Sequence, residues 1–188
     1  MSKKVILISG SPREKGNTMA VMNECKAVLE EHGVKAEVIS LAEKEVRACV
    51  ACYKCQKKKR CVLKDDFEDI ADKVLASDGF IIGSPVYYGT ARGDVLNFLQ
   101  RLGMVNGSRG RPLSGKVGGP IAVARRGGHT QTLQEMMMFF EISDMVVPGS
   151  TYWNMVIARN PGEAKKDKEG WETIRHFAKN VAKLVKKL

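Results

Sequence analysis

The sequence has no long hydrophobic run. A membrane-spanning helix needs about 18 uncharged apolar residues in succession, and the chain offers no such stretch. The apolar run near the start, Val5 to Ile8, stops at the turn sequence from Ser9 to Pro12. A run this short is not the core of a secretory signal peptide. We interpret it as a buried strand and expect a cytoplasmic protein.

Linkers, internal repeats and low-complexity segments are also missing. Apolar residues make up 44% of the 188 residues and charged residues 28%, a composition typical of a folded globular protein. A chain of this length can bury a sizeable core without disulfides. We therefore expect a single domain that spans residues 1–188.

Aromatic and acidic residues are few. Aromatics make up 6%, and Lys and Arg outnumber Asp and Glu by 31 to 21, which gives a net charge of +10. This charge favours acidic partners, but the chain shows no nucleic-acid-binding motif, so we expect no nucleic-acid partner. The positive excess lies in residues 54–60 and 165–187. The second segment is typical of a solvated helix face.

Residues for acid–base or nucleophilic catalysis are sparse. The three histidines, His32, His129 and His176, are too widely spaced to indicate a metal site. No Ser/His/Asp set or pair of carboxylates stands out. A Walker A loop and a Gly-x-Gly-x-x-Gly pattern are absent as well. We therefore assign no catalytic side chain.

What the chain does have is an alternation of strand and helix patterns. The predicted strands are Lys4–Ser9, Lys35–Ser40, Gly79–Ser84, Gly118–Ala124 and Asp144–Val147. The predicted helices are Asn17–His32, Asp66–Ala76, Arg92–Leu102, Thr130–Glu141 and a C-terminal helix over about 170–188. A cysteine-rich insertion loop covers 46–64. The alternation predicts an α/β fold, a doubly wound, flavodoxin-like parallel sheet of five strands in the order 2-1-3-4-5, with helices on both faces.

The loop after the first strand has the composition of a phosphate-binding turn. Small residues let backbone N–H groups converge on an anion, hydroxyls donate, and Arg13 adds a fork of donors beside a helix N-terminus. An ordinary strand-to-helix turn is the alternative, although it requires fewer hydroxyls and glycines. The predicted binding residues are Ser9, Ser11, Pro12, Arg13, Gly16, Asn17 and Thr18.

Two further loops belong to the same end of the predicted sheet, where ligands bind in this topology. The loop after the third strand offers two adjacent tyrosine rings to a planar ligand, unless these rings pack at the sheet edge. The loop after the fourth strand offers backbone amides and cations, which suit the pyrimidine edge of a flavin. The predicted binding residues are Ser84, Pro85, Val86, Tyr87, Tyr88 and Gly89, followed by Arg125, Arg126, Gly127 and Gly128.

Three of these motifs together resemble one family. The NADPH-dependent FMN reductases have motifs similar to Gly10-Ser-Pro-Arg…Gly16-Asn-Thr, Gly83-Ser-Pro-Val-Tyr-Tyr-Gly89 and Arg126-Gly-Gly128. The resemblance extends from Lys3 to about Trp153. It implies bound FMN, with the phosphate in the first loop and the isoalloxazine ring against the second. It also implies a homodimer, or a dimer of dimers, with the flavin near the subunit interface.

Four of the five cysteines crowd into thirteen residues. Cys49, Cys52, Cys55 and Cys61 have the spacing Cys-x2-Cys-x2-Cys-x5-Cys. In a cytoplasmic protein such crowding indicates metal or redox chemistry rather than disulfides. Thiolates at this density can hold one [4Fe–4S] cluster. A structural zinc site and free, redox-active thiols are the alternatives. Cys25 shares a helix face with apolar residues, and we expect it in the core.

The cysteine motif, in its place between the second strand and second helix, resembles the iron–sulfur flavoprotein branch of that family. This resemblance implies an oxidoreductase that passes electrons between a [4Fe–4S] cluster, FMN and a small acceptor. The alternatives are an NAD(P)H-dependent FMN or quinone reductase without a cluster, and an FMN-binding redox carrier or sensor. Three interpretations of the basic residues Lys54 and 57–60 remain open. They offset the negative charge of a cluster, they dock an acidic ferredoxin-like carrier, or they are simply solvated.

Overall fold

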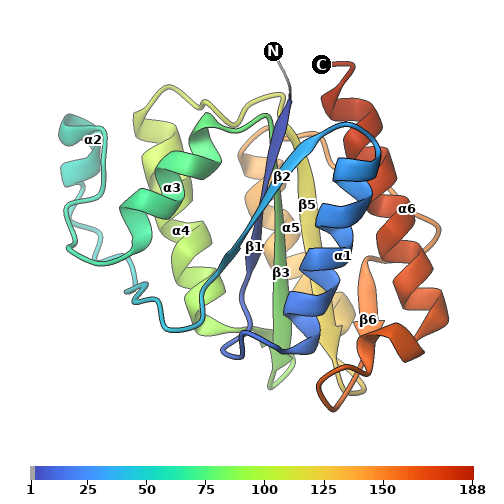
Figure 1. Ribbon diagram of the computed structural model, residues 1–188. Coiled ribbons are helices and arrows are strands. Elements are labelled where there is room, and N and C mark those ends of the chain that lie inside the picture. The colour runs from blue at the N-terminus through green and yellow to red at the C-terminus, as the bar shows by residue number, and fades with distance from the viewer. Residues whose placement is uncertain (1–2) are drawn as a thin grey trace.

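A parallel sheet forms the centre of the computed structural model, which describes residues 3–188 (Figure 1). Its strands lie side by side in the order β2 (Lys35–Ser40), β1 (Lys4–Ser9), β3 (Gly79–Tyr87), β5 (Val117–Ala124) and β6 (Met155–Ile157). A two-residue strand, β4 (Thr90–Ala91), pairs antiparallel with the end of β3. Without β4, this order is the predicted 2-1-3-4-5, so the flavodoxin-like fold is confirmed.

Helices cover both faces of the sheet (Figure 1). One face carries α1 (Asn17–Glu31) and α6 (Lys168–Val185), and the other carries α3 (Phe67–Ala76), α4 (Gly93–Ser108) and α5 (His129–Ile142). Two short helices, α2 (Lys54–Lys58) and the 3-10 helix η1 (Ala164–Lys166), lie in connecting segments. Among residues 3–188, no helix has the length and apolar character that a membrane crossing requires.

The two halves of the core follow from the alternation of side chains along β1. Val5 and Leu7 pack in the cluster with α1 and α6, whereas Ile6 and Ile8 pack in the cluster with α3, α4 and α5. All four are fully buried, because a central parallel strand is covered on both faces. Cys25 lies in the first cluster, as expected, and burial raises the pKa of its thiol far above its ordinary value.

The prediction of the last strand is wrong. Residues 144–147 make a single bridge, between Val146 and Val117 at the start of β5. The chain then leaves the sheet at Pro148, because proline has no N–H for a ladder hydrogen bond. It returns as β6, whose Met155 pairs with Ala122 near the end of β5. The edge position is therefore shared by two separate segments.

Three other elements differ from the predictions in extent. Strand β3 continues past Ser84 to Tyr87, so Pro85, Val86 and Tyr87, predicted in a loop, belong to the strand. The loop predicted over 46–64 contains the short helix α2, and the helix predicted over 92–102 continues to Ser108. Gly103 and Gly107 weaken the helical pattern in sequence. Burial of Val105 and Asn106 against the core favours the longer helix. The extra turns place the end of α4 beside the cysteine-rich loop.

Candidate functional site

Three loops meet at the carboxyl ends of β1, β3 and β5, at the lower edge of the sheet in Figure 1. The register pairs Ser9, the last residue of β1, with Gly83, and Gly83 with Ile121, so β3 and β5 continue past the end of β1 to Tyr87 and Ala124. Gly10 donates its N–H to the carbonyl of Gly83 over 2.8 Å, which joins the first two loops. The strand-order reversal, where ligands bind in such sheets, is therefore located between β1 and β3.

The loop after β1 is tightly curled around its own hydroxyl. Ser11 Oγ accepts the N–H of Arg13 and donates to the carbonyl of Arg13, both at 3.0 Å. A side-chain carbon at Gly16 would fall 2.7 Å from that Oγ, so the curl requires glycine there. Helix α1 starts without a side-chain cap, and the buried Ser9 Oγ has no hydrogen-bond partner. These unpaired donors fit a bound anion.

Asn17 has a different environment from the one predicted. Its Nδ2 donates to the carbonyl of Asn160 at 2.9 Å, and its Oδ1 accepts the N–H of Ala164 at 3.2 Å. The side chain thus ties the start of α1 to the segment before α6. In this conformation its amide is already engaged by the protein itself.

The end of β3 and the turn after it carry the two tyrosines outward: Tyr87 is the last residue of the strand and Tyr88 follows it. Tyr87 is 45% exposed and Tyr88 is fully exposed, so the ring of Tyr88 does not pack at the sheet edge. Tyr88 and Gly89 both adopt positive φ, at 51° and 84°, which turns the chain back into β4. Ser84 Oγ accepts the N–H of Arg92 at 3.0 Å and holds the base of this loop.

The loop after β5 is the third loop at this edge of the sheet. Arg125, Arg126 and Gly127 are exposed, and no described ion pair involves either arginine. Gly128 ends the loop in a left-handed conformation, with φ of 90°, directly before α5. Two arginines with unengaged guanidinium groups therefore stand at the same edge as the two tyrosines.

The structure thus brings all seventeen predicted binding residues to this edge, where they differ in how far they are buried. The buried ones are Ser9, Ser11, Gly16, Thr18 and Ser84; the half-buried ones are Asn17, Pro85, Val86, Gly89 and Gly128; the exposed ones are Pro12, Arg13, Tyr87, Tyr88, Arg125, Arg126 and Gly127. Sequence reasoning missed Arg92. Its Nη1 donates to the carbonyl of Gly10 at 3.3 Å, and it pairs with Asp94 at 2.6 Å.

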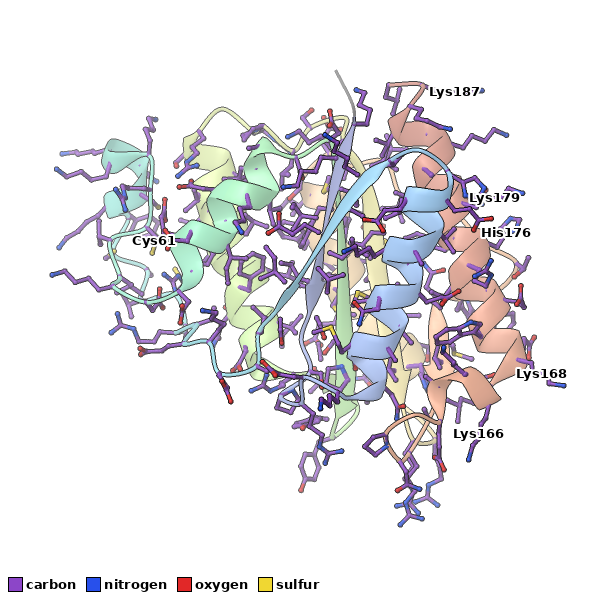
Figure 2. All side chains as sticks on the ribbon, in the orientation of Figure 1. Cys61, Lys166, Lys168, His176, Lys179 and Lys187 are labelled. Carbon is purple, nitrogen blue, oxygen red and sulfur yellow. The ribbon has the colours of Figure 1, made fainter. Side chains whose placement is uncertain are left out.

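The four clustered cysteines surround a second site. Cys49 and Cys52 are exposed, and Cys55 and Cys61 are half-buried. All four line one hollow, whose far wall is formed by residues of α4, Arg101 among them. Figure 2 shows Cys61 on the flank that carries α2 and α3, away from the lysines of α6. Among residues 3–188, no three Cys, His, Asp or Glu side chains converge on a point where one metal ion would sit.

Backbone conformation in this loop is unusual. Ala51 and Tyr53, on either side of Cys52, have positive φ values of 49° and 53°, and Lys59 has 58°. Such left-handed conformations are uncommon for residues other than glycine and persist where the surroundings enforce them. They turn the chain repeatedly, so that cysteines three residues apart face the same hollow.

One ridge of α4 fastens the loop to the domain. Asn97 Nδ2 donates to the carbonyl of Val46 at 3.0 Å, Arg101 Nη1 to that of Arg47 at 3.1 Å, and Arg109 Nε to that of Lys59 at 2.6 Å. Residues 97 and 101 lie on one face of α4 because they are four apart, and Arg109 follows the last residue of the helix. The loop is therefore held at its beginning and near its end by one rigid element.

Buried charges stand behind Cys61. Arg101 and Asp65 form an ion pair with both side chains at most 1% exposed. Burial alone raises the pKa of the Asp65 carboxyl, but hydrogen bonds from Arg101 and from the Arg47 N–H hold it below its ordinary value. Glu68 accepts the N–H of Cys61 at 2.8 Å, and burial raises the pKa of Glu68. None of these charged residues was predicted, because charged side chains usually face solvent.

Comparison with known proteins identifies the family. The model of the NADPH-dependent FMN reductases matches residues 3–160. The chain belongs to this family. Within it, the chain lies in the iron–sulfur flavoprotein branch: an iron–sulfur flavoprotein of Methanocaldococcus jannaschii is 38% identical over 190 residues, which cover 97% of each chain. This family member is accordingly an FMN-dependent oxidoreductase.

Solved structures share the fold at low sequence identity. RosB, solved with bound 8-demethyl-8-formylriboflavin-5'-phosphate, has a TM-score of 0.79 and 17% identity over 100% of this chain and 80% of its own. A flavodoxin from the domain Archaea has a TM-score of 0.64 and 16% identity over 97% of this chain and 99% of its own. These likenesses establish the architecture of this FMN reductase family member.

Proposed function

We propose that the protein is an electron-transfer flavoprotein in which Cys49, Cys52, Cys55 and Cys61 hold a [4Fe–4S] cluster and the three loops hold FMN. The observation that carries the proposal is the shared hollow: four thiols and a buried arginine line one space. A cluster would supply one-electron steps, and FMN would combine two of them to reduce a small acceptor.

The arrangement of the thiols favours a cluster over a single zinc ion. Zinc requires four ligands that converge to about 2.3 Å from one point. Here the cysteines are distributed around a hollow, and no such convergence exists among residues 3–188. A cluster places its own iron and sulfide atoms between the thiolates, so its ligands stand further apart than those of one zinc ion.

The loop after β1 is the proposed phosphate site of FMN. Its supports are the uncapped start of α1, the unpartnered Ser9 Oγ and the exposed guanidinium of Arg13. The isoalloxazine ring would lie against Tyr87 and Tyr88. The backbone amides and arginines of the loop after β5 would stabilise the negative charge that reduction places on the ring.

Exposed basic and apolar residues indicate the partners of the protein. The exposed lysines of α2, together with Lys59 and Arg60, belong to the same segment as the clustered cysteines and favour docking of an acidic ferredoxin-like carrier. A homodimer or dimer of dimers is the proposed assembly. It is supported by an exposed apolar face that includes Met138, Ile142 and Trp153.

Anaerobic purification followed by iron, acid-labile sulfide and FMN analysis tests the proposal. About four iron and four sulfide atoms per FMN are expected for one [4Fe–4S] cluster. Flavin without iron, together with rapid steady-state oxidation of NADPH, would instead establish the second candidate, an NAD(P)H-dependent FMN or quinone reductase. The family description favours that candidate next, because it names NADPH as the donor. Zinc in place of iron would make the cysteine loop structural.

A further inference from the structure

Arg101 is buried at the wall of the cysteine hollow, with most of its donors engaged. Nη1 donates to Asp65 Oδ2 at 2.5 Å and to the carbonyl of Arg47 at 3.1 Å. Nη2 donates to Asp65 Oδ1 at 2.9 Å and to Cys61 Sγ at 3.1 Å. The guanidinium carbon lies 4.1 Å from the centre of the Phe67 ring, which covers one face. The group is therefore held in one orientation.

One donor of this guanidinium has no partner. Nε is buried and makes no hydrogen bond. The guanidinium is planar, and its Nε–H runs parallel to one of the two N–H bonds of Nη2. Asp65 occupies the edge formed by Nη1 and Nη2, so the Nη2–H that reaches Cys61 is the one beside Nε–H. The unpartnered donor thus points to the same side as the contact with Cys61.

A buried N–H without a hydrogen-bond partner lowers the stability of the fold. Because this one lies beside four thiols, it indicates a ligand, bound among them, that accepts its hydrogen bond. We propose that Arg101 is a positioning residue for the cluster: its Nη2–H binds Cys61 Sγ, and its Nε–H binds a neighbouring sulfur of the bound cluster. This inference rests on the proposed function. It assigns to α4, a helix without cysteines, a direct part in setting the properties of the iron–sulfur site.

The positive charge of Arg101 determines the direction in which it shifts the reduction potential of the cluster. Reduction adds one electron to the cluster and requires no proton from Arg101, so the site gains one negative charge. A fixed cation with donors on sulfur stabilises this more negative state and raises the reduction potential. Asp65 opposes the effect from the neighbouring edge of the guanidinium, but its charge is directly paired with that of Arg101. Glu68, on the Cys61 N–H, is itself paired with Arg109 at 2.7 Å.

The test is a redox titration of the cluster in the full-length, FMN-loaded protein, followed by EPR and by visible absorbance. Arg101→Met removes charge and donors, and we expect at least a tenfold lower ratio of reduced to oxidised cluster at fixed potential, which is about 59 mV for one electron. Arg101→Lys keeps a charge for Asp65 but loses the paired donors, so its potential should fall by less while its EPR signal changes. Asp65→Asn should shift the potential upward.

Asn97→Ala is the matched control, because Asn97 anchors the same loop from the same helix without carrying a charge or touching a cysteine. Its potential should stay near that of the wild type. Equal potentials and spectra for Arg101→Lys, Arg101→Met and the wild type, at full iron content, would overturn the inference alone. Absence of iron and sulfide from the anaerobic wild type would overturn the proposed function and this inference with it.

Discussion

Gly128 lies against Gly89. A side-chain carbon at position 128 would stand 3.0 Å from the Cα of Gly89 and 2.8 Å from Cγ1 of Val86. The close approach brings the loop after β5 onto the loop after β3, so the arginines of one and the tyrosines of the other share one rim. Both glycines also have positive φ, which residues with a side chain rarely adopt.

The first prediction concerns this contact. Gly128→Ala should push the two loops apart and strain the backbone, lowering the free energy of unfolding by roughly 1–3 kcal/mol and weakening FMN binding. Thermal unfolding and titration of apoprotein with FMN measure the two effects. Gly127→Ala is the control, since nothing lies within 4 Å of its added carbon and its φ is not positive. Equal losses in both variants would refute the role of the contact.

The second prediction concerns Ser9. Its buried hydroxyl has no partner, so Ser9→Ala should leave the apoprotein as stable as the wild type or more stable. The same substitution should weaken FMN about ten- to a hundredfold, because a hydrogen bond to a charged phosphate contributes about 1.5–3 kcal/mol. Calorimetry of the apoprotein and flavin titration are both needed. Unchanged FMN affinity would place the phosphate elsewhere.

The third prediction concerns Arg13, which is exposed and makes no described ion pair. Arg13→Ala should weaken FMN by about ten- to a hundredfold, since a charge-assisted contact to phosphate contributes about 1.5–3 kcal/mol. Riboflavin lacks the phosphate, so its affinity should be the same in wild type and variant. If wild-type apoprotein binds riboflavin as tightly as FMN, the phosphate-loop assignment is wrong.

The fourth prediction concerns Tyr88. Its ring is fully exposed, so Tyr88→Ala should leave the unfolding temperature unchanged. Loss of ring stacking, about 0.5–1.5 kcal/mol, should weaken FMN by up to about tenfold and shift the flavin potential. Tyr88→Phe keeps the ring and should bind FMN like the wild type. An alanine variant with wild-type affinity and potential would remove Tyr88 from the flavin site.

The fifth prediction treats the four clustered cysteines as one unit. Ser in place of Cys49, Cys52, Cys55 or Cys61 should remove or convert the cluster while FMN stays bound, because the flavin loops are separate. Cys25→Ser should keep the iron and lower the free energy of unfolding by about 1–3 kcal/mol through a poorly paired buried hydroxyl. Iron per FMN after anaerobic purification, with flavin absorbance as reference, distinguishes these outcomes.

Much of the fold was predictable because its signals are local. Central strands such as Lys4–Ser9 are covered on both faces and are therefore continuous apolar runs, and their bounds match the prediction. The parallel direction then brings the loops after β1, β3 and β5 to one edge without further information. The edge segment was mispredicted because β6 has only three residues and a weak pattern.

Local patterns were enough to predict the α/β architecture, the loops that meet at one sheet edge and the crowding of four cysteines, since each follows from short stretches of chain. The residues behind those cysteines could be found only from the packing of distant segments. Arg101 lies 40 residues from Cys61 and Asp65 lies 36 from Arg101. In sequence they resemble solvent-exposed charges. They are buried together because α4 packs against both the core and the cysteine-rich loop, and a buried charge requires a partner.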